Sequence, residues 1–259
     1  MRHKQSLLTI LTVIIGVAGL ALLLYPTVSD WWNSTHQRRT VTDYTTLVAE
    51  LESTRHDEVF SAAEAYNRRL CESGILWDMD DEQQAEYTGL LNIDGSGVMG
   101  YISIPKINVT LPIYHGTSDK VLHFAVGHLS GTSLPVGGKG THCSVSGHRG
   151  LPSARLFTDL DKLSIGDTWT VTVLDRTMTY EVDQIHVVLP SDMEDLEIDP
   201  EQDYFTLITC TPYGVNSHRL LVRGHRIENK ADAVSASADA AQVSSARPAQ
   251  TPEDREKGQ

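Results

Sequence analysis

The sequence predicts a mainly β protein, an antiparallel sandwich or barrel with helices in front of it. From Gly97 onward, apolar residues alternate with polar ones in the period of two that strands require. The runs are short and turn residues separate them, as in sandwiches and barrels. Pro105 separates the first two strands, and residues 151–163 are expected to form a short helix. The expected strands are 97–104, 107–113, 141–147, 169–174, 178–188, 203–209 and 219–225.

Composition narrows the class of protein. The chain has 259 residues, enough for one domain of about 150 residues with appendages. Its net charge is −13, and it has no basic stripe with interleaved aromatic residues, so we expect no nucleic-acid partner. The histidines lack ligand-like spacing, so we expect no metal and no other cofactor. Cys71 and Cys143 either form a disulfide or, the favoured alternative, stay as unlinked thiols.

Residues 1–32 are predicted to be a cytoplasmic stub and a membrane anchor. The apolar run Leu7–Tyr25, about 19 residues at 1.5 Å rise, covers most of a ~30 Å hydrocarbon core. Arg2 and Lys4 in front of it predict that the N-terminus stays inside and the rest of the chain lies outside. Two tryptophans follow, at positions 31 and 32, where indole rings favour the membrane interface.

A cleaved signal peptide is the alternative to this anchor, because the apolar run is near the upper size of such a segment. The stretch Tyr25–Ser29 that follows lacks a clear small-x-small cleavage site. This favours a retained, single-pass anchor in the cell membrane.

Residues 33–96 are predicted to be a helical segment. Apolar residues recur at steps of three and four between about Thr40 and Leu70, which predicts one amphipathic helix. Residues 72–87 are acidic and irregular. After Ile227 the chain is rich in Ala, Ser, Gln, Asp and Glu, so residues 228–259 are predicted to be a disordered polar tail without a second span.

The stretch Thr206–Gly214 carries the strongest chemical signal. A strand ends at Cys210, and a turn rich in Pro and Gly follows at once. His148 lies between glycines upstream, and Arg219 comes nine residues after the cysteine. A free thiol with a pKa of ~8.5 is mostly protonated at neutral pH, and a nearby imidazolium or guanidinium stabilises the reactive thiolate. The plain alternative is that Cys210 is a small buried apolar residue.

Each of the three residues has an expected role. Cys210 is the candidate nucleophile and His148 the candidate general acid. A tight turn would place Arg219 on the strand next to Cys210, where its guanidinium can bind substrate or a developing oxyanion. Arg223 competes with Arg219, because residues four apart on a strand share a face.

These residues carry a family resemblance. Thr206–Cys210 resembles the Thr-Leu-x-Thr-Cys signature of sortases, the cysteine transpeptidases of Gram-positive cell surfaces. The longer stretches 209–224, 146–152 and 127–135 resemble class C, the pilin-polymerising type. The resemblance covers about residues 60–227 and implies a closed barrel of about eight strands with outer helices, here at residues 97–227. It favours Arg219 over Arg223.

The resemblance also implies a lid within residues 72–87. Class C sortases usually carry an Asp-Pro-aromatic tip there, which plugs the active site. The corresponding residues here are Trp77, Asp78 and Met79, so the proline is missing and the acid is shifted by one place. A lid in which Trp77 or Met79 covers Cys210 and a simple solvated linker both remain open.

The expected function is that of a membrane-anchored extracellular cysteine transpeptidase. The resemblance implies cleavage of a Leu-Pro-x-Thr-Gly-like sorting signal between Thr and Gly, and transfer of the acyl group to a pilin lysine. The partners would be pilins or surface proteins with such signals. Two alternatives remain: a sortase that anchors proteins to peptidoglycan, and a non-enzymatic surface adhesin with a buried thiol.

Overall fold

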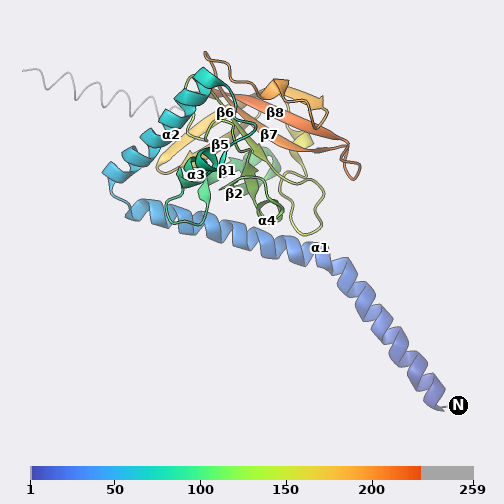
Figure 1. Ribbon diagram of the computed structural model, residues 1–259. Coiled ribbons are helices and arrows are strands. Elements are labelled where there is room, and N and C mark those ends of the chain that lie inside the picture. The colour runs from blue at the N-terminus through green and yellow to red at the C-terminus, as the bar shows by residue number, and fades with distance from the viewer. Residues whose placement is uncertain (1, 229–259) are drawn as a thin grey trace, which may run out of the picture. The chain divides into compact units, whose positions relative to one another are not determined.

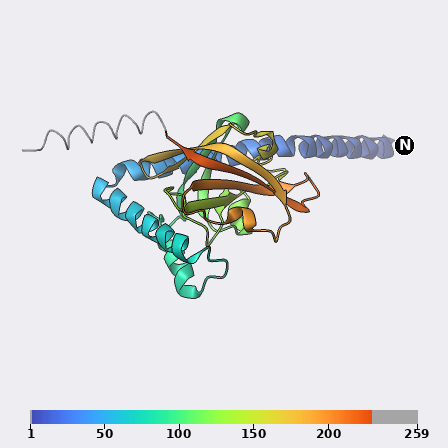
Figure 2. The same cartoon turned by 90° about the horizontal axis from the view of Figure 1, so that it is seen from above.

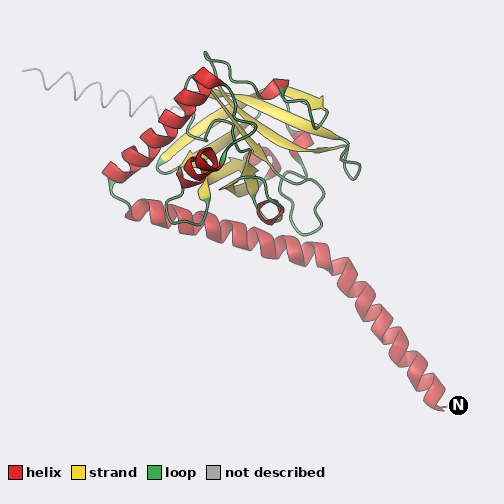
Figure 3. Cartoon of the chain, in the orientation of Figure 1, coloured by secondary structure: helices red, strands yellow, loops and turns green. Residues whose placement is uncertain are grey.

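A computed structural model of the chain describes residues 2–228, with side chains from residue 10 onward, and its eight strands close into a barrel (Figures 1 and 3). The order around the barrel is β1-β2-β3-β4-β7-β8-β6-β5. The strands are β1 Val98–Ile104, β2 Val109–His115, β3 Val126–His128, β4 Thr141–Ser146, β5 Thr168–Val173, β6 Arg176–Val188, β7 Asp203–Thr211 and β8 His218–Ile227.

The closed eight-stranded barrel and seven of its strands are confirmed, but the barrel is mixed and not purely antiparallel. Two neighbouring pairs, β2–β3 and β4–β7, are parallel. The sequence pattern missed β3, because three residues are too few to show a period of two. The predicted tail 228–259 lies, apart from Glu228, outside the described residues.

The expected single helix between residues 40 and 70 is wrong, because two helices meet there at a corner (Figures 1 and 2). The first helix continues to Glu50, and Glu52 has an extended backbone with φ −66° and ψ 144°. The carbonyl of Glu52 then accepts the first hydrogen bonds of the second helix. The helices are α1 Arg2–Glu50, α2 Ser53–Ser73, α3 Asp81–Gly89 and α4 Asp119–Leu122, with short 3₁₀ helices η1 Pro105–Ile107, η2 Leu160–Lys162 and η3 Glu194–Leu196.

Two further expectations need correction. Residues 72–87 are not uniformly irregular, because Asp80 caps α3 in a reciprocal capping box with Gln83. Residues 151–163 form turns and only the short η2, not an α-helix. Leu156 has φ +38°, a positive value that interrupts any regular helix there.

The N-terminal part of α1 is long and apolar enough to cross a membrane. The helix bends before it reaches the barrel (Figure 1). Pro26 lies inside α1, and a proline in a helix interior removes one hydrogen bond and kinks the helix. The candidate span and the helix segment that packs on the barrel are thus one continuous element.

The C-terminal half of α1 is bonded to the barrel. The buried Tyr44 hydroxyl donates to Met99 O at 3.0 Å and accepts from Leu174 N at 2.8 Å. Closer to the apolar segment, Gln37 Nε2 donates to Phe124 O at 2.7 Å. These bonds join α1 to backbone groups of three distant segments of the barrel domain.

The barrel interior decides which side chains of β7 face outward. Trp169, Tyr180 and Phe205 pack against one another inside the barrel, and Leu207 is also fully buried. Because side chains alternate along a strand, the even-numbered residues of β7 point to the outer surface of the barrel. Cys210 therefore belongs to the outer face.

All three cysteines are free thiols. Cys71 and Cys143 are unlinked, the alternative that the sequence favoured. Burial raises the pKa of Cys143 well above its usual range, whereas Cys210 is only half-buried. Of these two thiols, Cys143 is the one locked in an apolar interior.

The first prediction concerns the attachment of α1. Tyr44→Phe leaves the buried amide of Leu174 and the carbonyl of Met99 without their shared partner, so the free energy of unfolding should fall by about 1–3 kcal/mol. Urea unfolding of the detergent-solubilised chain measures this. Tyr101→Phe is the matched control, because this half-buried ring packs edge-on against Tyr44, and it should cost less than about 0.5 kcal/mol. Equal losses in both variants would contradict the assignment.

Candidate active site

The candidate site lies where β4, β7 and β8 run side by side. In the parallel pair β4–β7, Ser146 stands opposite Ile208, and Gly147 N donates to Ile208 O at 3.0 Å. His148 comes two residues after Ser146, and Cys210 comes two residues after Ile208. The two residues, 62 positions apart in sequence, therefore leave neighbouring strands at the same end of the barrel.

Arg219 lies on the other side of Cys210. In the antiparallel pair β7–β8, the two residues stand directly opposite each other. Directly opposed residues point to the same face, with Cβ atoms about 4.5–5.5 Å apart. The prediction that the turn brings Cys210 and Arg219 onto adjacent antiparallel strands is confirmed. The strand register thus sets Cys210 opposite Arg219 on one side and next to the chain that carries His148 on the other.

The surroundings of His148 lower its pKa. Burial is the largest cause, and the neighbouring His123 adds to it, whereas Asp119 acts in the opposite direction. Both neighbours belong to the region of α4. A lowered pKa makes the imidazolium a stronger acid and also reduces the fraction of the ring that is protonated near neutral pH.

The two candidate arginines have different surroundings. Arg219 Nη1 bonds the carbonyls of Asn216 and His218, at 3.3 and 3.1 Å, and so stays near the β7–β8 turn. Arg223 forms a two-point ion pair with Asp183, at 3.1 and 2.9 Å. The guanidinium of Arg223 is thus already paired with the Asp183 carboxylate, as in a structural ion pair.

A pocket of about 190 Å³ borders the strand that carries Cys210. Its floor includes Ile208, Arg219 and Leu221, from the outer faces of β7 and β8. Its wall is the β6–β7 loop, which contributes Pro190, Met193 and Leu196. The lining is mostly apolar but also includes the guanidinium of Arg219 and the carboxylate of Asp192, and the pocket can receive an extended chain with an apolar side chain.

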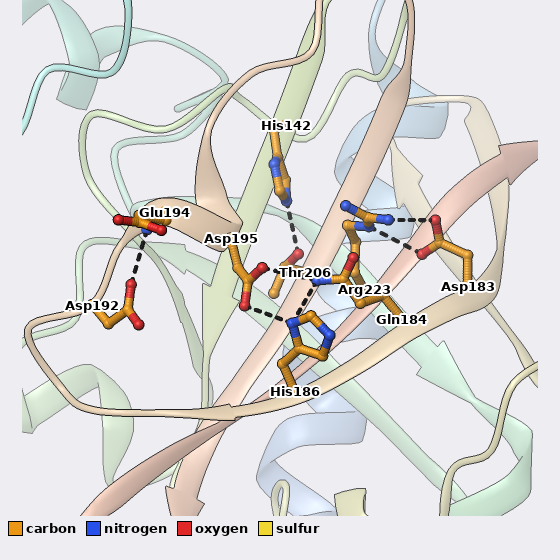
Figure 4. Close-up of polar contacts among 9 residues, drawn as sticks. All are labelled: His142, Asp183, Gln184, His186, Asp192, Glu194, Asp195, Thr206 and Arg223. Carbon is orange, nitrogen blue, oxygen red and sulfur yellow. Dashed lines mark hydrogen bonds and ion pairs between the residues drawn. The ribbon is translucent and has the colours of Figure 1, made fainter.

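A polar cluster fixes the β6–β7 loop against the barrel (Figure 4). His186 Nδ1 and Gln184 Nε2, both on β6, bond the carboxylate of Asp195, each at 2.9 Å. The buried His142 bonds Glu197 O through Nδ1 at 2.8 Å and Thr206 Oγ1 through Nε2 at 2.7 Å. The wall of the pocket is thus held by side chains of β4, β6 and β7.

A neutral ring suits the position of His142. The carbonyl of Glu197 can only accept, so Nδ1 carries the proton, and Nε2 accepts from the Thr206 hydroxyl. Burial lowers the pKa of His142 to about 4. Protonation would place a charge in a buried site and reverse the bond to Thr206, whose hydroxyl oxygen would then accept from Nε2.

The predicted lid residues follow Ile75, which packs against residues that line the pocket. Ile75 packs against the apolar cluster that includes Ile208, and Leu76 N donates to Gly131 O at 3.2 Å. Trp77 is 48% exposed, and Met79 packs against the large core. Asp78 lies between them in the same bend.

Sequence reasoning missed the supports of the site. The cluster around Asp195 and the α4 residues near His148 come from separate elements, and no local pattern joins them. Within residues 10–228, where side chains are described, no group of three or more His, Cys, Asp or Glu side chains is placed to hold a metal ion.

Comparison with known proteins gives consistent matches. A family model described as "Sortase domain" matches residues 102–227. The crystal structure of sortase C1 from Streptococcus agalactiae is 54% identical, covers 74% of this chain and all of its own chain, and has a TM-score of 0.73. Sortase C of Streptococcus pneumoniae, described with reference to pilin substrate specificity, is 41% identical, with 74% and 97% coverage and a TM-score of 0.67. Clostridium perfringens sortase C with a C-terminal cell wall sorting motif is 42% identical, with 74% and 99% coverage and a TM-score of 0.65.

The second prediction concerns His142 and acid. The folded state takes up a proton near pH 4, whereas an unfolded histidine takes it up near 6.5. The free energy of unfolding should therefore fall as the pH drops from about 6.5 towards 4, by up to ~1.4 kcal/mol per pH unit for this group. Urea unfolding at pH 7, 6 and 5 measures the slope.

In His142→Gln the dependence of the unfolding free energy on pH should weaken by the equivalent of up to one proton. Glutamine can also donate and accept hydrogen bonds, but it does not titrate. The exposed His36→Gln is the matched control and should keep the slope of the unchanged protein. His128, whose pKa burial also lowers to about 4, contributes equally to all three proteins. Equal slopes in the His142 variant and the unchanged chain would contradict the assignment.

Proposed function

Because this chain belongs to the sortase family of transpeptidases, we propose that Cys210 is its nucleophile, with His148 as general acid and Arg219 as the substrate-binding guanidinium. The observation that carries the proposal is the strand register. It sets Cys210 opposite Arg219 and level with His148, on the outer face of the barrel. The half-buried state of Cys210 supports this role over that of a core residue.

The first half of the reaction is acyl transfer to the enzyme. The thiolate of Cys210 attacks the Thr carbonyl carbon of a Leu-Pro-x-Thr-Gly-like signal and forms a carbon–sulfur bond. Arg219 donates hydrogen bonds to the oxyanion or to the substrate backbone while negative charge develops. The Thr–Gly bond breaks, the Gly amine leaves with a proton from His148, and a thioester remains on Cys210.

The second half transfers the acyl group to a pilin lysine. The neutral lysine amine attacks the thioester carbonyl, and the carbon–sulfur bond breaks. The amine proton passes to His148, which restores the imidazolium and the thiolate. The product is an isopeptide bond between two pilin subunits.

Two of the solved relatives support this choice of substrate. The Clostridium perfringens sortase C structure contains a cell wall sorting motif, and the Streptococcus pneumoniae enzyme is described with reference to pilin substrates. The mostly apolar pocket lined by Ile208 and Arg219 suits the leucine of such a signal in this chain. We propose the same substrate class here, with peptidoglycan anchoring as the competing outcome.

The proposed location is the cell membrane, with the catalytic domain outside. The apolar N-terminal part of α1 supports a single-pass anchor at residues 1–32. Because α1 runs without a break from that segment to the barrel, residues 97–227 would stand next to the membrane surface.

The third prediction tests the chemistry. With a sorting-signal peptide as donor, Cys210→Ala should abolish transfer, and His148→Ala should lower the rate by about 10³-fold or more, because nucleophile and acid act as a unit. Cys71→Ala, a second half-buried cysteine, is the matched control and should keep full activity. Product formation is measured by mass spectrometry with two acceptors, a pilin domain that offers lysine and a cell-wall peptide amine.

The outcomes separate the three functions. Transfer to the pilin lysine supports polymerisation, whereas transfer only to the wall peptide supports anchoring to peptidoglycan. Activity in Cys210→Ala overturns the mechanism. No transfer to either acceptor, with no alkylation of Cys210 near neutral pH, supports the adhesin.

We also propose that residues 72–87 form a lid that limits access to Cys210. The contact of Ile75 with the cluster around Ile208 supports it, because that cluster forms the pocket floor. The fourth prediction is that Trp77→Ala and Met79→Ala raise the alkylation rate of Cys210 by about threefold or more, followed by mass spectrometry. Unchanged rates in both variants would favour the solvated linker.

A further inference from the structure

The last ladder bond between β4 and β7 is made just before the reacting pair. It joins Gly147 N to Ile208 O, and His148 and Cys210 come after it. Two neighbouring strands can splay apart beyond their final hydrogen bond. Something else must set the spacing of the two side chains.

Side chains take over where the ladder ends. The buried Thr209 hydroxyl donates to Gly147 O at 2.7 Å. On the far side of the pair, Arg149 Nη1 donates to Thr211 Oγ1 at 3.2 Å. The residues before His148 and Cys210 are thus bonded to each other, and so are the residues after them. We call these two bonds the β4–β7 seam.

The Arg149 bond is anchored at its far end as well. The second guanidinium nitrogen, Nη2, pairs with the carboxylate of Asp161, just outside β4 and β7. The arginine side chain is only 9% exposed, and Nε is buried with no hydrogen-bond partner among the described residues. Burying a guanidinium with one nitrogen unpaired costs free energy. A surface charge would not need this buried position, so we look for another role for Arg149.

The turn that holds Arg149 has little room to move. A methyl group at Gly150 would come within 2.7 Å of the Tyr213 ring, so the β7–β8 connection and the turn are in close contact there too. Phe157 N donates to His148 O at 3.1 Å, and Gly150 N donates to Thr158 Oγ1 at 3.1 Å. The turn is bounded by the β7–β8 connection on one side and bonded to its own loop on the other.

We propose that Arg149 is a positioning residue, which holds His148 at reacting distance from Cys210 through its bond to Thr211. The inference rests on the proposed roles of Cys210 and His148. Arg149 does not touch substrate in this scheme. Because an error of 1 Å in such a pair can cost about 10²-fold in rate, loss of the bond should lower kcat while substrate binding stays intact.

The test uses the full chain and a quenched peptide with a Leu-Pro-x-Thr-Gly signal. Thr211→Val keeps the shape of the threonine side chain and leaves Arg149 unchanged, but it removes the hydroxyl that accepts the hydrogen bond. We therefore expect kcat to fall about tenfold, with KM changed less than twofold. Thr211→Ser restores a hydroxyl and should restore kcat to within about twofold of the unchanged enzyme. Arg149→Lys should also lower kcat, because an ammonium cannot bridge two partners as a guanidinium fork does.

A double variant tests the Arg149–Thr211 hydrogen bond directly, because the effects of two substitutions in one contact do not add. Thr211→Val in an Arg149→Lys background should have little further effect, because residues in one contact are coupled. Arg155→Lys is the matched control, since this arginine lies in the same loop and pairs with Asp159 on the surface. It should keep full activity. Thermal unfolding of each variant confirms that it is folded, and Thr211→Val and Thr211→Ser decide the question if Arg149→Lys is not.

The inference is overturned if Thr211→Val keeps kcat within twofold, if Thr211→Ser loses as much as Thr211→Val, or if the two losses simply multiply. Cys210→Ala separates this failure from that of the proposed function. If Cys210→Ala is inactive while the Thr211 and Arg149 variants are fully active, only the positioning role is contradicted. An active Cys210→Ala sinks the proposed function first.

Discussion

The parallel pairing of β4 with β7 is the constraint on which the candidate site depends. Six residues of each strand pair in register, from Thr141 opposite Asp203 to Ser146 opposite Ile208. In a parallel pair both chains leave the ladder at the same end, so the residues at the two strand exits must meet there. His148 is the second residue after β4, and Cys210 is the second-to-last residue of β7. β8 then adds Arg219 from the opposite direction.

The barrel interior gives this arrangement its outward direction. The aromatic core around Phe205 fixes the face of β7, and alternation turns Cys210 away from the interior. A shift of one residue in the β7 register would bury the thiol and expose a core residue. Packing and chemistry are therefore set by the same strand, and the polar cluster around Asp195 only shapes the space above it.

Much of this fold could be predicted from sequence, because most strands are long enough to show alternation. The pairing of Cys210 with Arg219 was also predictable, since a short turn joins their strands. The nearness of His148 was not, because 62 residues intervene and the parallel pairing leaves no local pattern. The break at Glu52 carries no Gly or Pro, and β3 has only three residues, so both escaped detection.

The unbroken course of α1 has a mechanical consequence. A flexible linker would let the barrel tumble above a bilayer and sample every orientation. Here the bonds from Gln37 and Tyr44 hold the part of α1 after Pro26 against the barrel. The docked part of α1, and not a loose linker, therefore sets the distance between the barrel and the residues around Pro26.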